Sequence, residues 1–576
     1  MRKKMAKILR FENTAELQLK LADKYLAEGN IPSAVQALKN AVSYGGDNSV
    51  RMQLGEVYMR AGLVGQAFDV FTQAYADGDD STQCLFGLCR TAFFMGYDVE
   101  SADYFKRIFL KNLSEITKNE TFGYDVDEMS EEFSAITSMI PDNHGFTFVK
   151  NNESREFSEE VMNLLRENPE KALPYFESIP KSSPLYWEAR NNVALICLML
   201  GSVEEAKEEC KKVLSHDGKD VFALSTLLAT YSALSDYVGV ERIVKKIESI
   251  KVTDEERIRK IALAMCQSGI HDKAVKYLSL LDEHKYEKNI MLLLAIAYYN
   301  TSNVTKSLAV LRDMQKLYTK DSIMISDFIR RVSEQTEREI EYSINLPHNV
   351  VLKNINRCRK WFGADYDDVC FDLSGLIDVL KSEENYKLLY WYLTNHAYLY
   401  KSDEIVLLFR LCQTGDERAI GILTDLLLDS DVEDYLKRKT MRVLISGGWD
   451  RKTFMVKGAK ILSTQPKYPK AWSEAVERGK DIDLLWTEAF SIAYSELFMR
   501  HEGFEKEIQS VAETVYNNLK NYDTQTIRTP FAIASVMYRR IKSCEDEKDA
   551  TIREIFAVSA KTFNKYEKIC FEVKDE

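Results

Sequence analysis

Residues 17–46 read LQLKLADKYLAEGNIPSAVQALKNAVSYGG, and residues 50–79 read VRMQLGEVYMRAGLVGQAFDVFTQAYADGD. The second stretch repeats the pattern of the first, displaced by 33 residues. The matched pairs are Leu21 and Leu54, Ala22 and Gly55, Tyr25 and Tyr58, Gly29 and Gly62, Ala34 and Ala67, Leu38 and Phe71, and Ala41 and Ala74. A period of this length is typical of stacked helical hairpins.

The conserved spacing gives each residue type a physical role. Ala22 and Gly55 are small where the two helices of one hairpin cross closely. Gly29 and Gly62 stand where the first helix should end in a left-handed cap, which glycine adopts without strain. Since one hairpin cannot bury its apolar faces alone, the units should stack into a solenoid.

These residues resemble the tetratricopeptide repeat family. Two features of the family pattern are replaced: Gln18 and Arg51 hold the place of its tryptophan, and Gly46 and Asp79 the place of its closing proline. The resemblance implies a right-handed superhelix of helical hairpins with a concave groove that binds polypeptide segments.

The same pattern continues in degenerate form through the first 320 residues. Five further repeats are expected, at 82–111, 187–218, 221–252, 255–284 and 288–320. The acidic segment 119–157 interrupts them and is interpreted as an insertion or loop. Residues 329–342 (IRRVSEQTEREIEY) are expected to form a charged helix that caps or connects the solenoid.

The resemblance also places nine residues in the groove. The apolar positions form two rows along the first helices of the hairpins, with polar residues between them. One row is Leu26, Met59 and Phe93, the other is Leu19, Met52 and Phe86, and the polar residues are Asp23, Glu56 and Arg90. The lysines and asparagines with which some family members hold a C-terminal carboxylate do not occur in these rows. The stripe suits an amphipathic helix or an extended apolar segment, or it packs against the chain's own next element.

The second half has a different spacing, and the all-α class is expected to continue there. Residues 416–428 and 432–444 resemble a HEAT-type helix pair, and residues 452–463 alternate like a small β-hairpin. The predicted division of the chain has six parts: repeats at 1–118, the insertion at 119–157, repeats and a connecting helix at 158–345, HEAT-like helices at 346–447, the hairpin and a linker at 448–484, and a C-terminal helical domain at 485–576.

The last helices resemble a helix-turn-helix module, with three helices expected in all. Ser559 should cap the final helix, whose outer face would carry the candidate DNA-contact residues Lys561, Asn564, Lys565 and Lys568. Arg553 and Ala557 replace the small residue and the turn glycine of that module. Residues 529–576 contain nine Lys and Arg and nine Asp and Glu, so this segment has no net positive charge to attract phosphate. Packing or protein contact is the alternative use.

The composition limits the binding partners and the cellular compartment that we expect for the protein. The formal net charge of −12 disfavours nucleic acid and anionic lipid as the main partner. The sequence lacks an apolar run of about 18 residues, so we expect no membrane span. Ten cysteines without a C-x-x-C pair are expected to be buried thiols of a reducing compartment. The protein is therefore expected to be cytoplasmic.

No sequence motif indicates catalysis. Phosphate-binding loops, dinucleotide fingerprints, zinc-protease motifs and serine-hydrolase elbows are missing. The seven histidines lie far apart without ligand spacing, although folding could still assemble a site from distant residues. We therefore expect a non-enzymatic scaffold without metal, cofactor or small-molecule substrate, whose partner is a protein or peptide segment. The alternative is a transcriptional regulator with a repeat sensor and a C-terminal module that contacts DNA.

Overall fold

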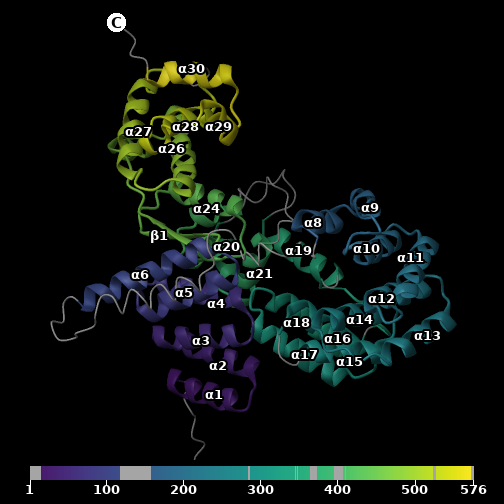
Figure 1. Cartoon of the computed structure of the whole chain (residues 1–576). Coiled ribbons are helices and arrows are strands. Elements are labelled where there is room, and N and C mark those ends of the chain that lie inside the picture. The colour runs from purple at the N-terminus through teal and green to yellow at the C-terminus, as the bar shows by residue number, and fades with distance from the viewer. Residues whose placement is uncertain are drawn as a thin grey trace, which may run out of the picture. The chain divides into compact units, whose positions relative to one another are not determined.

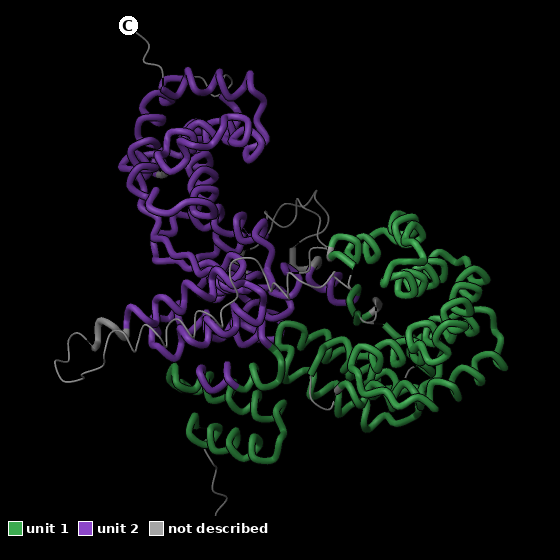
Figure 2. The backbone as a smooth tube through the Cα atoms, in the orientation of Figure 1, with its two compact units in different colours: residues 1–50, 57–63, 124–352 green, residues 51–56, 64–123, 353–576 purple. Residues whose placement is uncertain are grey.

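In a computed structural model of the chain, most of the described residues lie in helices (Figure 1). The structure describes residues 14–116, 157–282, 286–362 except 336, 344 and 347, 373–394, 407–522 except 409, and 527–571. All of the predicted insertion except its last residue lies outside these ranges. The chain divides into two compact units, residues 1–50, 57–63 and 124–352 in the first and residues 51–56, 64–123 and 353–576 in the second (Figure 2).

Helices make up most of the described part of the first unit. The helix α3 (Asn48–Arg60) has residues in both units, as has α19 (His348–Phe362). The other helices of the first unit are α1 (Ala15–Ala27), α2 (Ile31–Ser43), α8 (Glu159–Glu167), α9 (Pro169–Glu177), α10 (Tyr186–Met199), α11 (Val203–His216), α12 (Val221–Ala233), α13 (Tyr237–Glu248), α14 (Glu255–Gln267), α15 (His271–Asp282), α16 (Lys288–Asn300), α17 (Val304–Leu317) and α18 (Ser322–Glu334).

The helices from α10 to α17 form four consecutive hairpins, which confirms the repeats predicted between 187 and 320. The two helices of each hairpin pack on each other, and one continuous apolar core runs from α10 to α16. Within each hairpin, a residue with positive φ ends the first helix. Gly201 and Gly269 take this role in two hairpins, and Ser235 (φ 56°) and Ser302 (φ 60°) take it in the other two.

The first hairpin of the chain packs against the last of these repeats. The helix α2 contacts α17, where Lys39 Nζ donates to the Lys316 carbonyl at 2.6 Å and Lys316 Nζ donates to Ser33 Oγ at 3.2 Å. The second helix of the N-terminal hairpin therefore has a partner within its own unit.

The helix predicted at 329–342 is wrong in its bounds. The helix α18 begins at Ser322 and ends at Glu334, followed by Gln335 with φ of 48°. Its apolar residues Ile325, Phe328 and Val332 are buried, and this stripe decides where the helix lies. After it the backbone is not helical: Ile340 exchanges two hydrogen bonds with the Asn300 side chain, at 2.8 and 2.9 Å.

The second unit contains the remaining repeats and the C-terminal half. Its elements are α4 (Val64–Ala76), α5 (Thr82–Phe94), α6 (Asp98–Ile116), α20 (Leu373–Leu380), α21 (Glu383–Thr394), α23 (Glu417–Leu428), α24 (Asp434–Ser446), β1 (Thr453–Lys457), β2 (Lys460–Thr464), α25 (Lys470–Arg478), α26 (Asp481–Arg500), α27 (Glu505–Leu519), α28 (Pro530–Arg539), the 3₁₀ turn η2 (Lys542–Cys544), α29 (Asp549–Ile555) and α30 (Ala560–Phe571).

The small residues of the repeats allow very close packing, as the sequence predicted. A Cβ atom on Gly55 would lie 2.4 Å from the Phe71 ring, and one on Gly87 would lie 2.8 Å from the same ring. The Phe71 side chain is buried between these two glycines. A methyl group at either glycine would therefore require the ring to move.

The predicted β-hairpin is confirmed. Strands β1 and β2 pair antiparallel, with Val456 opposite Ile461 and Gly458 at φ of 57° in the turn. The hairpin packs on the repeats of the same unit: the Tyr104 hydroxyl donates to the Ala459 carbonyl at 2.9 Å, and the Tyr75 and Phe454 rings lie 6.2 Å apart. The outer sides of α4 and α6 thus have partners within the second unit.

The C-terminal helices surround α26. This helix is buried on most of its sides and packs against α24, α25, α27 and α28. The fully buried Trp486 contacts the ring of Tyr516 at 5.0 Å and donates from Nε1 to the Ala512 carbonyl at 3.1 Å. The helices α28, α29 and α30 pack together at the end of the chain, as the predicted trihelical module requires.

Candidate functional site

The helix α5 presents one polar and aromatic face in the second unit. The hydroxyl of Ser81 caps its N-terminus by accepting from Cys84 N at 3.2 Å, and Gly96 (φ 83°) follows its C-terminus. Its apolar face packs on α4 and α6. Phe86, Arg90 and Phe93 recur four and three residues apart, which places them on one face of the helix.

An ion pair joins this face to α3. One nitrogen of Arg90, Nη1, lies 2.9 Å from Glu56 Oε1 and 3.1 Å from Oε2. The guanidinium also lies over the Phe86 ring, 5.6 Å from its centroid. Both charged side chains are partly exposed, so their pairing contributes at most about 1 kcal/mol and leaves both charges available to a partner.

The aromatic residues of this face reach solvent. Phe86 is 48% exposed, and Phe94 is 63% exposed beside Phe93, with the two rings 5.7 Å apart in an edge-to-face contact. The family spacing selects Phe93 and passes over Phe94, although the Phe-Phe pair is visible in the sequence. We name Glu56, Phe86, Arg90, Phe93 and Phe94 the α5 surface.

Met52 does not join this surface. Its side chain is 2% exposed, so it has no surface left for a partner, whereas Glu56 one turn later is half-exposed. Helical spacing placed Met52 in the same row as Phe86, but spacing gives no information about which side chain the surrounding structure covers.

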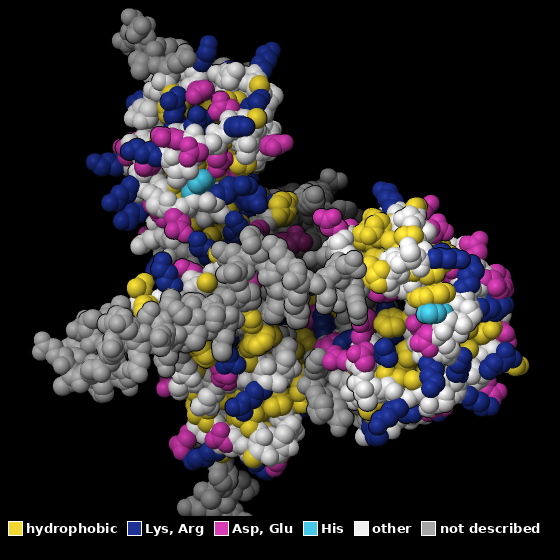
Figure 3. All heavy atoms as spheres, in the orientation of Figure 1, with side chains coloured by type: hydrophobic (Ala, Val, Ile, Leu, Met, Phe, Trp, Pro, Cys, Tyr) yellow, Lys and Arg dark blue, Asp and Glu magenta, His cyan; other side chains and the backbone are white. Residues whose placement is uncertain are grey.

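The other predicted groove residues belong to the first unit. Leu19, Asp23 and Leu26 share one face of α1, where Asp23 is exposed and the two leucines are half-buried. Met59, near the end of α3, is also half-buried. Figure 3 shows hydrophobic side chains at the surface over the N-terminal helices. Each of these four residues therefore retains some solvent access.

A family model described as tetratricopeptide repeat matches residues 19–82. This segment contains both near-perfect repeats and their glycine caps. This segment is therefore similar to the tetratricopeptide repeat family.

A search of curated proteins gave no significant match. Among solved structures, the chain is similar to a tetratricopeptide repeat protein from Parabacteroides merdae, with 14% sequence identity and a TM-score of 0.21. The match covers 55% of this chain and 98% of the other. The likeness to the family therefore depends on the sequence match over residues 19–82 and on the observed hairpins.

The C-terminal end of the chain has the predicted helix, turn and helix. Ser559 Oγ accepts from Thr562 N at 3.2 Å and caps α30, and Ala557 occupies the turn with φ of 52°. Ile552, Val558 and Phe563 are buried, as expected for internal contacts. The predicted DNA-contact residues are all exposed along α30: Lys561, Asn564, Lys565 and Lys568.

A group of three aspartates in the second unit is explained by the fold. Asp69 on α4 accepts from the backbone N and the hydroxyl of Ser430, at 3.1 and 2.7 Å. Asp429 accepts from Asp431 N at 2.8 Å and from the Tyr390 hydroxyl at 2.5 Å. These hydrogen bonds tie the turn after α23 to the repeats, so the group is a structural link.

No helix in the described ranges is both long enough and apolar enough to cross a lipid bilayer.

Proposed function

We propose that this protein is a non-enzymatic adaptor that binds a polypeptide segment on the first helices of its N-terminal repeats. Repeats of this family bind protein partners. The α5 surface is the observation that carries the proposal, because it combines two exposed phenylalanines with a partly exposed ion pair. Aromatic and arginine side chains are the residues that most often dominate binding energy at interfaces.

The chemistry of the surface defines the partner. Phe86 and Phe94 offer apolar area, and Glu56 and Arg90 offer one charge of each sign at the edge of that area. An amphipathic helix would place its apolar stripe on the rings and a polar side chain against the ion pair. In the first unit, Leu19, Asp23, Leu26 and Met59 are proposed as a separate set of contacts.

The outer helices support this choice of face. In the first unit α2 packs on α17, and in the second unit α4 and α6 pack on the β-hairpin or α23. The outer sides of those helices already make contacts within the chain. The first helices of the repeats remain the better candidates for a partner.

Site-specific photo-crosslinking tests the proposal. The full chain would carry p-benzoylphenylalanine in place of Phe86 or Phe94, and, as a control, in place of Tyr237, which is 79% exposed on α13. We expect a discrete protein adduct from positions 86 and 94 and none of the same mass from position 237. The same adducts from all three positions, or an intramolecular product alone, would reject the adaptor role of this face.

A triple variant provides the second arm of the test. Leu26→Glu, Met59→Glu and Phe93→Glu together should lower capture of the crosslinked partner at least about tenfold, since losing a central apolar contact costs about 2 kcal/mol. The matched control is Met199→Glu, Tyr237→Glu and Val238→Glu, three exposed apolar residues of other repeats. Circular dichroism must show that both variants keep their helix content.

A second candidate function is DNA contact by α30. It is favoured by the four exposed polar residues along this capped helix. Fluorescence anisotropy with the full chain and a labelled duplex should then show binding that weakens with salt and is lost in Lys561→Glu with Lys565→Glu. Equal anisotropy for the parent and the variant at low salt would dispose of this candidate.

The cytoplasm is the proposed compartment. The nine cysteines within the described residues are free thiols, and eight of them are buried. Such thiols are typical of proteins in reducing surroundings.

A further inference from the structure

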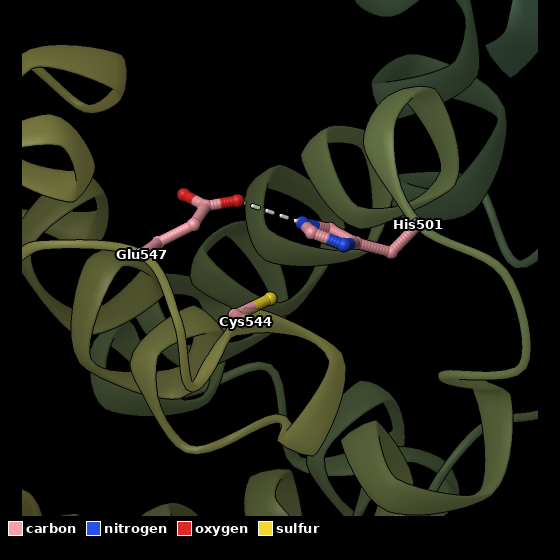
Figure 4. A group of neighbouring side chains, drawn as sticks. All are labelled: His501, Cys544 and Glu547. Atoms are coloured by element: carbon pink, nitrogen blue, oxygen red, sulfur yellow. Dashed lines mark hydrogen bonds and ion pairs between the residues drawn. The ribbon is translucent and has the colours of Figure 1, made fainter.

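Three potential metal ligands converge at the C-terminal end of α26. His501 follows that helix directly, Cys544 ends the turn η2, and Glu547 precedes α29. One ligand atom from each residue lies within 4.8 Å of the other two. Figure 4 shows the imidazole and the carboxylate turned toward each other, with the thiol beside them.

The local backbone holds the three side chains in place. His501 N donates to the Leu497 carbonyl at 2.8 Å, which fixes the histidine on the last turn of α26. Glu547 N donates to the Cys544 carbonyl at 3.1 Å, so a single turn brings these two residues to the same side. The ligands therefore stand on a helix end and a closed turn.

The site is largely shielded from solvent. The Cys544 side chain is fully buried, and the side chains of His501 and Glu547 are 14% and 24% exposed. Water therefore has limited access to the carboxylate and the thiol.

Present contacts leave one ligand atom, an oxygen of Glu547, without a hydrogen-bond partner. Glu547 Oε1 lies 3.0 Å from His501 Nε2 and accepts from the Tyr538 hydroxyl at 2.9 Å, whereas Glu547 Oε2 is buried without a hydrogen-bond partner. The sulfur of Cys544 lies 4.0 Å from the hydroxyl of Ser543. A buried carboxylate oxygen without a partner is costly, and a cation would remove that cost.

A metal ion would also have to displace the proton of the Cys544 thiol. Burial, with a smaller contribution from the negative charge of Glu547, raises the pKa of the Cys544 thiol to about 11. A divalent cation has the opposite effect, because a coordinated thiol loses its proton.

We propose that His501 Nε2, Cys544 Sγ and the Glu547 carboxylate bind a zinc ion. Imidazole, thiolate and carboxylate are the three ligand types that zinc takes in proteins. Ligand atoms around one tetrahedral zinc lie about 3.5 Å apart, from bond lengths near 2.0–2.3 Å, so the present group needs only small movements.

Binding has defined consequences for the neighbouring groups. The Cys544 proton leaves to solvent as the thiolate binds the metal, so each ion that enters releases a proton. The proton of the His501 ring must lie on Nδ1 so that Nε2 can give its lone pair to zinc. The Tyr538 hydroxyl, now 2.7 Å from Nε2, then loses that contact and keeps its hydrogen bond to Glu547. Three protein ligands leave the fourth position to water. The ion would fasten the end of α26 to the segment between η2 and α29.

Cobalt titration of the full chain tests the site. The reduced protein, freed of metal by a chelator, should bind one Co²⁺ and develop the near-ultraviolet band of a cobalt thiolate, and Zn²⁺ should abolish this band. Cys544→Ala should remove the band, and Glu547→Gln should weaken Co²⁺ binding at least about tenfold. The matched control is Cys570→Ala, a buried cysteine of α30 whose raised pKa comes from burial alone.

Thermal unfolding gives a readout independent of absorbance. Zn²⁺ should raise the unfolding temperature of the parent and of Cys570→Ala but not of Cys544→Ala or His501→Ala. Absence of a cobalt thiolate band in the folded parent would overturn the proposal, as would an unchanged band in Cys544→Ala. The group would then be a hydrogen-bond network of His501, Tyr538 and Glu547. Neither result depends on the adaptor proposal.

Discussion

The helical-hairpin repeats and the C-terminal helices arrange their packing in two different ways. The repeat helices pack mainly on helices one or two places away in the chain, as α12 does on α10, α11, α13 and α14. The long helix α26 is instead buried on most of its sides by four other helices. In the repeats, similar helix–helix interfaces follow one another along the chain, whereas the C-terminal helices pack around one central helix, α26.

This difference predicts how far the destabilising effect of a substitution extends through the protein. In a row of repeats, stability is approximately a sum of units and nearest-neighbour interfaces, so a defect weakens its own neighbourhood first. Where several helices share one central helix, losing that helix removes the packing of all of them. Substitutions of similar severity should therefore have local effects in the repeats and regional effects around α26.

The largest effect is expected for Trp486→Ala. The side chain is fully buried in α26 against Tyr516 and donates a hydrogen bond to Ala512, so its removal should cost about 3–5 kcal/mol. Hydrogen exchange measured by mass spectrometry should show faster exchange in α25, α26, α27 and α28 together. The control is Trp187→Ala on α10, whose half-buried ring stacks on His216 at 4.3 Å and should cost about 1 kcal/mol. Faster exchange confined to α26 would contradict its central role.

Gly55→Ala should produce the next largest effect, and it should stay local. A methyl group there would lie 2.4 Å from the Phe71 ring, and such overpacking costs about 1–3 kcal/mol. This exceeds the gain of about 1 kcal/mol that alanine brings to a helix interior. Faster exchange is expected in α3, α4 and α5 and unchanged exchange in α26.

Two further variants isolate the cause of that effect. Gly65→Ala on α4 meets no atom within 4 Å and should leave stability unchanged or slightly higher. Adding Phe71→Leu to Gly55→Ala should restore part of the loss, since the smaller side chain makes room. An equal loss from Gly55→Ala and Gly65→Ala would show that close packing on Phe71 is not the reason.

The sequence predicted the repeats well because their signals are local. Gly29 and Gly62 have the left-handed φ values of 72° and 74° that their role requires, and the hairpin at Gly458 follows from strand alternation around a turn residue. The helix at 329–342 was misplaced because its charges suggested a solvated helix, whereas buried residues such as Phe328 determine the observed position of α18.

The candidate sites depend on burial and on contacts between distant segments, and residue spacing reveals neither. Helical spacing placed Met52 in the groove, although surrounding side chains bury it. The remaining groove residues stay a prediction. His501, Cys544 and Glu547 showed no ligand spacing, because α26 and the turn before α29 meet only in the folded chain. Such a group could not be found without the structure.

The smallest effect is expected from substitutions that compare the turns of different repeats. Ser235 and Ser302 occupy the left-handed position that Gly201 and Gly269 hold in the other hairpins, and a side chain in that conformation costs roughly 1–2 kcal/mol. Ser235→Gly should therefore stabilise the chain by about 1 kcal/mol after the entropy cost of glycine. The reciprocal Gly269→Ala should destabilise it by a similar amount, because the nearest atom to its new Cβ is 4.0 Å away and only the backbone is strained. Thermal unfolding of the two variants should shift in opposite directions. A shift in the same direction would mean that the serine side chain, rather than the backbone conformation, determines the stability of this turn.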